Sequence, residues 1–132
     1  MNTLSRVYIF KISATLIFWC IPLLLFPKEI LRQIGFPEHE TYMFVRMLGW
    51  AYLALCVGYY TGLRASLKGV KIMSPIYVGL VSNSGACIYL LYFGPAGTWT
   101  SWGTAVQFIA WSSVVATFLI TIGLYLFGIK GN

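Results

Sequence analysis

One arginine interrupts a long apolar stretch of this sequence. Residues 44–63 read FVRMLGWAYLALCVGYYTGL, and Arg46 is the one charged residue among them. A guanidinium suits phosphate or carboxylate, because its planar fork donates two hydrogen bonds at once. A charge within a stretch long enough to cross a membrane is a functional hypothesis by default. The sequence therefore makes Arg46 the first candidate for binding an anionic or polar group.

Arg46 also has a structural interpretation. It lies about one turn inside the apolar stretch, where a long side chain can extend to the membrane interface. There it could pair with Glu38 or Glu40. In the binding interpretation, aromatic and amide side chains of this stretch and of others complete a pocket beside the guanidinium. The predicted ligand-binding set is Arg46, Trp50, Asn83, Gln107 and Trp111.

Other kinds of chemistry lack their usual residues. No acid lies within an apolar stretch, so a proton- or sodium-coupled transporter lacks its usual carrier. The lone histidine excludes a bis-histidine haem held by this chain alone, and no Ser/His/Asp set or P-loop is present. The run Glu38-His39-Glu40 is interpreted as a solvated loop, with a metal site as the alternative. We predict no catalytic residue, metal or cofactor, and a non-enzyme is favoured over an enzyme.

Composition assigns the chain to a membrane. Of its 132 residues 59% are hydrophobic and 9% charged, against about 25% charged in ordinary globular domains. A helix of about 20 apolar residues crosses the hydrocarbon region, and four such stretches occur, at about 7–26, 42–63, 72–93 and 104–128. We predict an all-α, integral membrane four-helix bundle in one domain, residues 1–132. The lipid bilayer is the expected partner and nucleic acid is not.

The segment after the first stretch predicts a short amphipathic helix in the headgroup zone. It begins after Pro27, and Gly35 is expected to end it. One face is apolar and the other is polar; the apolar residues are Ile30, Leu31 and Ile34, and the polar ones are Lys28, Glu29, Arg32 and Gln33.

Charge placement predicts the orientation, since Lys and Arg mark the cytoplasmic side. Both termini and the connection 64–71 are assigned there; the positive residues of that side are Arg6, Lys11, Arg64, Lys68, Lys71 and Lys130. Lys11 is expected to extend to the interface. Trp99 and Trp102 are expected in an interfacial aromatic belt on the other side. The location predicted is the bacterial inner membrane.

Two patterns concern packing. CIPLLLFP from Cys20 resembles CIYLLYFGP from Cys87, and Arg46 corresponds to Gln107, which suggests a parallel two-unit repeat. Small and polar residues also form stripes at helical spacing, which we interpret as packing faces or as the lining of a pocket or partner interface. The stripes are Ala51, Ala54, Gly58 and Gly62; Gly79, Ser82, Asn83 and Ala86; and Gln107, Ala110, Val114, Thr117 and Thr121. The cysteines Cys20, Cys56 and Cys87 are interpreted as small buried apolar residues.

The order FPKEILRQIGFPE, then FVRMLGWAYLALCVGYY, then Arg64 resembles small bacterial four-span proteins of the DoxX-like and related uncharacterised groups. There a short helix ending in Gly precedes an Arg-x-Leu-Gly start of the second span, which Arg46, Leu48 and Gly49 match. Some DoxX relatives are linked to thiosulfate–quinone chemistry. For this chain the resemblance implies the architecture and not that activity.

The leading functional hypothesis is a non-catalytic accessory subunit or helper of a larger membrane complex, with other membrane chains or further copies of itself as partners. The alternative is a lipid- or quinone-binding membrane protein, possibly an enzyme, with its pocket near Arg46. A channel of several copies is a weaker third hypothesis.

Overall fold

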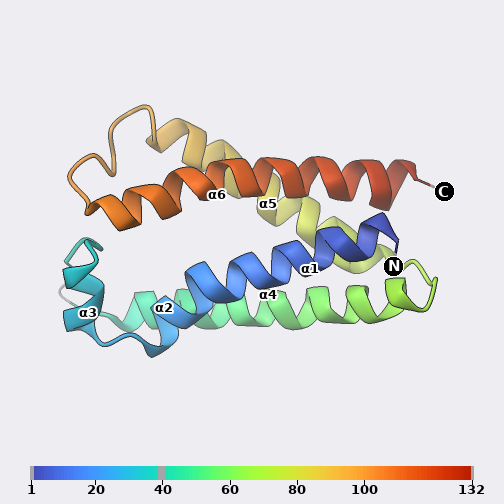
Figure 1. Ribbon diagram of the computed structural model, residues 1–132, viewed down its shortest axis with the longest axis horizontal. Helices are drawn as coiled ribbons and strands as arrows, with labels where there is room; N and C mark the ends of the chain where they lie inside the picture. The colour runs from blue at the N-terminus through green and yellow to red at the C-terminus, as the bar shows by residue number, and fades with distance from the viewer. Residues whose placement is uncertain (1, 39–40, 132) are drawn as a thin grey trace.

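Four long helical segments run side by side in the computed structural model, which describes residues 2–38 and 41–131 (Figure 1). The elements in chain order are α1 (Thr3–Thr15), η1 (Leu16–Cys20), α2 (Ile21–Leu25), α3 (Lys28–Gln33), α4 (Met43–Leu67), α5 (Met73–Phe93), α6 (Thr104–Gly123) and η2 (Leu124–Lys130). α1, η1 and α2 form one continuous segment, as do α6 and η2, so four segments are long and apolar enough to cross a membrane. The predicted all-α fold, with a short helix after the first span, is confirmed.

The segments pack as two pairs. The first segment lies against α4, and α5 lies against α6 and η2 (Figure 1). Both termini lie at one end of the bundle, together with the connection from α4 to α5. α3 and the connection 94–103 lie at the opposite end. The chain therefore runs up, down, up and down, with the two predicted repeat units as neighbouring helix pairs.

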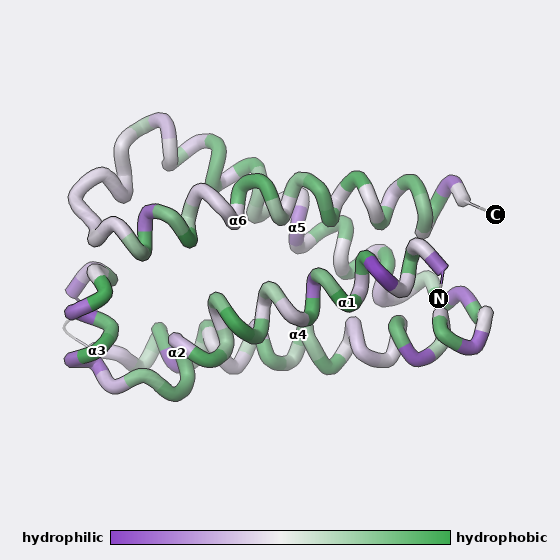
Figure 2. Tube along the Cα trace, viewed as in Figure 1, coloured by the Kyte–Doolittle hydropathy of each residue, from purple (hydrophilic) through white to green (hydrophobic). Residues whose placement is uncertain are grey.

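Apolar side chains cover the outside of the long segments, and hydrophilic residues gather mainly at the two ends (Figure 2). Large residues such as Phe44, Val81 and Phe108 are 67%, 74% and 68% exposed. A water-soluble protein would rarely expose so continuous an apolar surface, whereas lipid tails solvate it. This surface supports an integral membrane protein.

The first segment is longer than predicted. Its helix begins at Thr3 and not at residue 7, because the Asn2 side chain caps it: Asn2 Oδ1 accepts a hydrogen bond from the Ser5 backbone N–H at 2.8 Å. Asn2 Nδ2 also donates to the Ser66 carbonyl at 3.1 Å, which ties this end to α4. As a result Lys11 lies eight residues inside the segment and not near its end.

A π-helical turn follows in the same segment. In η1 the backbone N–H of Ile21 donates to the Leu16 carbonyl, five residues back. The next residue is Pro22, which has no backbone N–H and whose ring would collide with the carbonyl four residues earlier in a regular helix. The wider turn removes that conflict. It also shifts the side chains of η1, including Trp19, relative to those of α1.

The bundle is tightly packed toward the termini. Tyr8, Tyr59, Ile76 and Leu124 belong to one buried apolar cluster there. Gly62 allows the close approach, since a Cβ at this position would lie 2.9 Å from both the Pro75 ring and the Tyr8 ring. The three cysteines are buried and free, as predicted for small apolar residues.

α3 packs onto the opposite end of the bundle. Leu31 of its apolar face is 1% exposed. The helix ends where predicted, with Gly35 at φ +96°. The backbone N–H of Gly103 donates to the Gly35 carbonyl at 3.1 Å, so α3 is joined to the connection that precedes α6.

Candidate functional site

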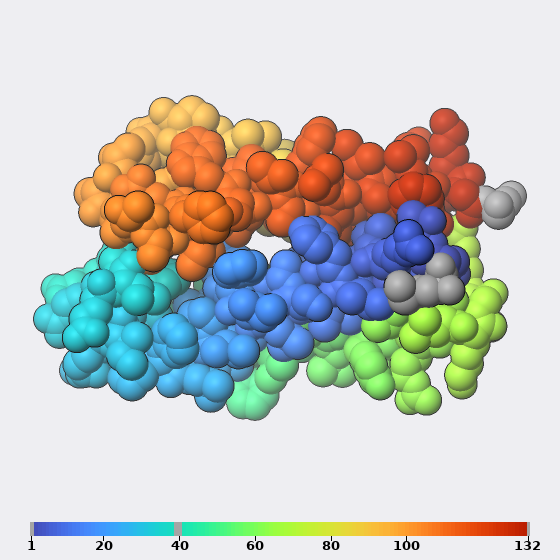
Figure 3. Space-filling model, viewed as in Figure 1, coloured from blue at the N-terminus to red at the C-terminus, as the bar shows by residue number. Residues whose placement is uncertain are grey.

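A cavity of about 510 Å³ lies between α1, η1, α4, α5 and α6. The space-filling view shows a gap between the first segment and α6, near the middle of their length (Figure 3). The rim residues Phe10, Phe18 and Phe108 line the cavity and are themselves exposed. Because this side of the bundle would face lipid, the cavity opens toward the bilayer.

The cavity wall is mostly apolar and aromatic, with a few polar groups. Its aromatic residues include Trp19 and Tyr52, whose ring centroids lie 5.7 Å apart, and Trp99. The polar residues of the wall are Lys11, Thr15, Ser82, Asn83, Ser112, Ser113 and Thr117. An apolar pocket with a small number of convergent polar groups is the usual form of a small-molecule site.

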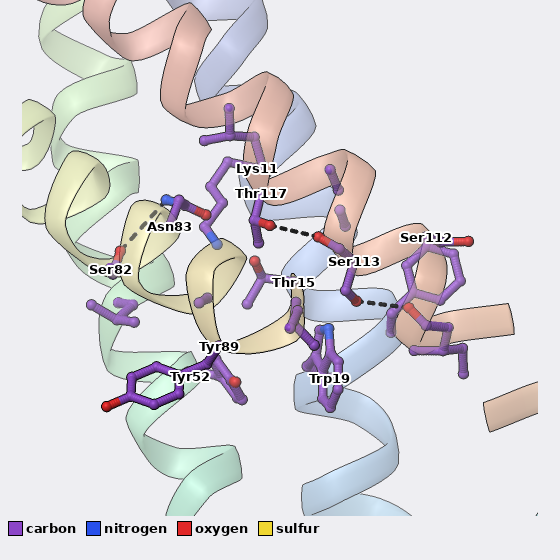
Figure 4. Close-up of a pocket in the computed structure, with 18 of the residues that line it drawn as sticks. Lys11, Thr15, Trp19, Tyr52, Ser82, Asn83, Tyr89, Ser112, Ser113 and Thr117 are labelled. Atoms are coloured by element: carbon purple, nitrogen blue, oxygen red, sulfur yellow. Dashed lines mark hydrogen bonds between the residues drawn. The ribbon is translucent and has the colours of Figure 1, made fainter. Parts of the chain in front are cut away.

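Lys11 is the one charged residue of this wall. Its Nζ lies 5.6 Å from the centroid of the Tyr59 ring, a cation–π distance. Within the described residues it has neither an ion pair nor a hydrogen bond. The expected extension of Lys11 to the interface is wrong, because the helix begins four residues earlier than predicted and the side chain points between the spans toward Asn83 and Thr117 (Figure 4).

Asn83 carries an acceptor without a partner. The residue is 1% exposed, and its Nδ2 donates to the Gly79 carbonyl at 2.6 Å. That bond fixes which end of the amide faces the helix backbone. Asn83 Oδ1 is buried and has no hydrogen-bond partner among the residues that the structure describes. Such an atom is costly in an apolar interior unless something supplies a donor.

Three hydroxyl groups of the wall are already hydrogen-bonded. Ser113 donates to the Ile109 carbonyl at 2.8 Å, and Thr117 donates to the Ser113 carbonyl at 2.7 Å (Figure 4). Ser82 shares a 2.7 Å hydrogen bond with the Tyr59 hydroxyl. Among the described residues, the polar groups of the wall without a hydrogen bond include Lys11 Nζ, Asn83 Oδ1 and the buried Trp99 N–H, together with the hydroxyls of Thr15 and Ser112. Lys11 carries the one charge of this set, and Asn83 Oδ1 is its buried acceptor.

Arg46 does not line the cavity and instead caps the C-terminal end of the first helical segment. Its guanidinium donates to the carbonyls of Leu23 and Phe26, each at 2.6 Å. These carbonyls belong to the end of the first segment, which has no following turn to satisfy them. Glu38 pairs with Arg32 at 3.2 Å, and Glu40 and His39 lie outside the described residues. The structural interpretation of Arg46 therefore accounts for the two hydrogen bonds that its side chain makes to described residues.

The other predicted residues are also dispersed. Gln107 donates to the carbonyls of Thr100 and Trp102 at 3.1 and 2.8 Å and so holds the connection before α6. Trp50 is 65% exposed on the outside of α4. Trp111 contacts the cavity indirectly, with its ring 5.3 Å from that of Trp99. Of the five predicted binding residues, Asn83 alone lines the cavity.

Trp99 also differs from its predicted place in an interfacial belt. It is 4% exposed and lines the cavity. Gly94 leaves room for its ring, since a Cβ there would lie 2.6 Å from it. The sequence signals that pointed to the cavity were Lys11 in an apolar stretch and the stripe Ser82, Asn83 and Ala86, all of which line it.

Comparison with protein-family models, curated proteins and solved structures finds no match to this chain. The resemblance to DoxX-like proteins thus leaves the four-span architecture as its supported part.

Arg46→Met is expected to lower stability by about 2 kcal/mol, because it removes charged donors from two otherwise unsatisfied carbonyls. Unfolding of the purified protein in mild detergent measures the change. The control is Arg64→Met, an exposed arginine near the end of α4, which should leave stability nearly unchanged. Equal stability of the two variants would show that the Arg46 bonds contribute nothing.

Proposed function

We propose that this chain is a membrane-embedded binding protein for a small, mostly apolar molecule, such as a lipid or a quinone-like compound. The observation that carries the proposal is the cavity of about 510 Å³ with Lys11 and Asn83 in its wall. Ligand sites commonly measure about 300–1,000 Å³ and bury most of the ligand. This proposal takes up the alternative hypothesis from the sequence and moves its site from Arg46 to this cavity.

Packing supports an occupied cavity. Protein interiors are filled to nearly crystalline density, and voids larger than one water molecule are few. Here the terminal half of the bundle is closed by glycine contacts such as that of Gly62, while the middle stays open beside Ala86 and Ala116. The opening between α1 and α6 gives a lipid-soluble molecule a route that avoids water.

Ala86→Phe is expected to remove the bound molecule, because the added ring would occupy the cavity. Native mass spectrometry and lipid extraction of the gently purified protein should show occupancy reduced about tenfold, equivalent to about 1.4 kcal/mol. The matched control is Ala54→Phe, which places the same ring on the exposed face of α4. Equal occupancy in the two variants, or an empty native protein, would count against the proposal.

A second candidate function, an accessory subunit of a membrane complex, has its own supporting observation. Three small residues of the α4 stripe, Ala51, Ala54 and Gly58, face outward and not into the bundle. A Cβ at Gly58 would meet nothing within 4 Å. Small outward residues allow close approach of another transmembrane helix.

The same variants test this second candidate. Ala54→Phe should abolish association with another chain, because the ring would prevent close helix contact, while Ala86→Phe should leave it intact. Native mass spectrometry in mild detergent reads the stoichiometry. A native protein that is strictly monomeric, with no accompanying chain, would reject the subunit hypothesis.

We also infer that the end carrying both termini is cytoplasmic. Even without Lys11, the cationic residues at this end exceed those at the other; they are Arg6, Arg64, Lys68, Lys71 and Lys130, against Lys28, Arg32 and Arg46. This asymmetry follows the positive-inside rule.

Single cysteines placed at the exposed positions Lys68 and Ser101 test the orientation. A membrane-impermeant maleimide should label Ser101→Cys in intact cells. It should label Lys68→Cys only after the cells have been permeabilised. The native cysteines are buried and provide the unlabelled background. The reverse labelling pattern would invert the assigned orientation.

A further inference from the structure

We propose that the bound molecule is an amphiphile with one apolar chain and a carboxylate, and that Lys11 pairs with this carboxylate deep inside the bundle. The inference rests on the proposed binding function and specifies the chemistry of its ligand. It follows from three observations: the charge of Lys11, the free acceptor of Asn83, and the depth at which both lie.

The first observation is the charge of Lys11, which contacts the Tyr59 ring but has no ion pair among the described residues. An ammonium group in a low-dielectric region is costly unless it is paired. All acidic side chains of the sequence are Glu29, Glu38 and Glu40, which fall between the first two spans and outside every long helix. No carboxylate of the described residues lines the cavity, and an anionic ligand would supply the counter-charge of Lys11.

The second observation is Asn83 Oδ1, which is buried in the same wall without a partner. An ammonium carries three N–H donors. With one of them directed to Asn83 Oδ1, two remain for the oxygens of a carboxylate. Asn83 thus positions the ammonium, and the side chains of Lys11 and Asn83 already point into one space (Figure 4).

The third observation, depth, favours a single-chain acid over a phospholipid phosphate. Lys11 lies eight residues after Thr3, which at 1.5 Å per residue is about 12 Å along the helix axis. A phosphate anchored in the headgroup layer lies outside the hydrocarbon, whereas a single-chain acid can enter through the gap between α1 and α6. The aromatic walls at Trp19 and Tyr52 then contact the chain.

The test compares an acid with its own ester. The full chain is placed in phosphatidylcholine nanodiscs and titrated with cis-parinaric acid or with its methyl ester. Energy transfer from Trp19 and Trp99, which line the cavity, to the polyene reports binding. Empty nanodiscs and the Ala86→Phe variant give the signal from partition into lipid alone.

The native protein should bind the acid about tenfold more tightly than the ester. Lys11→Met should abolish this preference, because it should weaken binding of the acid and leave binding of the ester unchanged. The matched control Lys68→Met, at an exposed lysine, should retain it. Asn83→Asp supplies an internal carboxylate for Lys11, so it should also abolish the preference, and it gives an independent result if Lys11→Met fails to fold.

The outcomes separate this inference from the function on which it rests. Saturable binding of acid and ester with equal affinity would overturn the inference that the ligand carries a carboxylate, and it would support the apolar binding function. An acid preference that survives both Lys11→Met and Asn83→Asp would overturn the role of Lys11. No saturable binding of either probe above the Ala86→Phe signal would overturn the binding function as well.

Discussion

Within the hydrocarbon region no water is available, so each backbone and side-chain polar group needs a partner inside the protein. The two positions matched by the sequence repeat obey this requirement in parallel ways. Arg46 donates hydrogen bonds to the carbonyls at the end of the first segment, and Gln107 donates to those of the connection before α6. The hydroxyl groups of Ser113 and Thr117 are bonded to carbonyls of their own helix. Among the described residues, Lys11 Nζ, Asn83 Oδ1, the Tyr8 hydroxyl and the Trp99 N–H depart from this rule, and Lys11, Asn83 and Trp99 line the same cavity.

The two halves of the bundle have different packing. Toward the termini, Gly62 brings α4 against Tyr8 and Pro75, and the buried cluster fills the space between the helices. Toward the middle, the turn imposed by Pro22 widens the first segment next to the cavity. The tight half fixes the helix pairs relative to each other, so the open half can keep a hollow without losing the arrangement of the spans.

Hydrophobic length was sufficient to predict the four spans, whereas an amphipathic pattern between Pro27 and Gly35 predicted the short helix and its end. The location of the site was harder to predict. Helical periodicity identifies which residues of α5 share a face, and it correctly grouped Ser82, Asn83 and Ala86. It does not say which faces of other helices lie opposite, so Arg46 and Gln107 were assigned to the same pocket. Lys11 was misplaced because the cap formed by Asn2 involves polar residues that hydropathy excludes from a span.

Under the proposed binding function, the lateral gap between α1 and α6 would make the membrane itself the reservoir from which the cavity fills. Occupancy then follows the mole fraction of a compound among the lipids and not its aqueous concentration. A ligand molecule would reach the opening by two-dimensional diffusion in the bilayer, at a rate set by membrane viscosity. An affinity quoted against total concentration would combine partition into the bilayer with recognition by the protein. Membranes of different composition would consequently load the same chain to different extents.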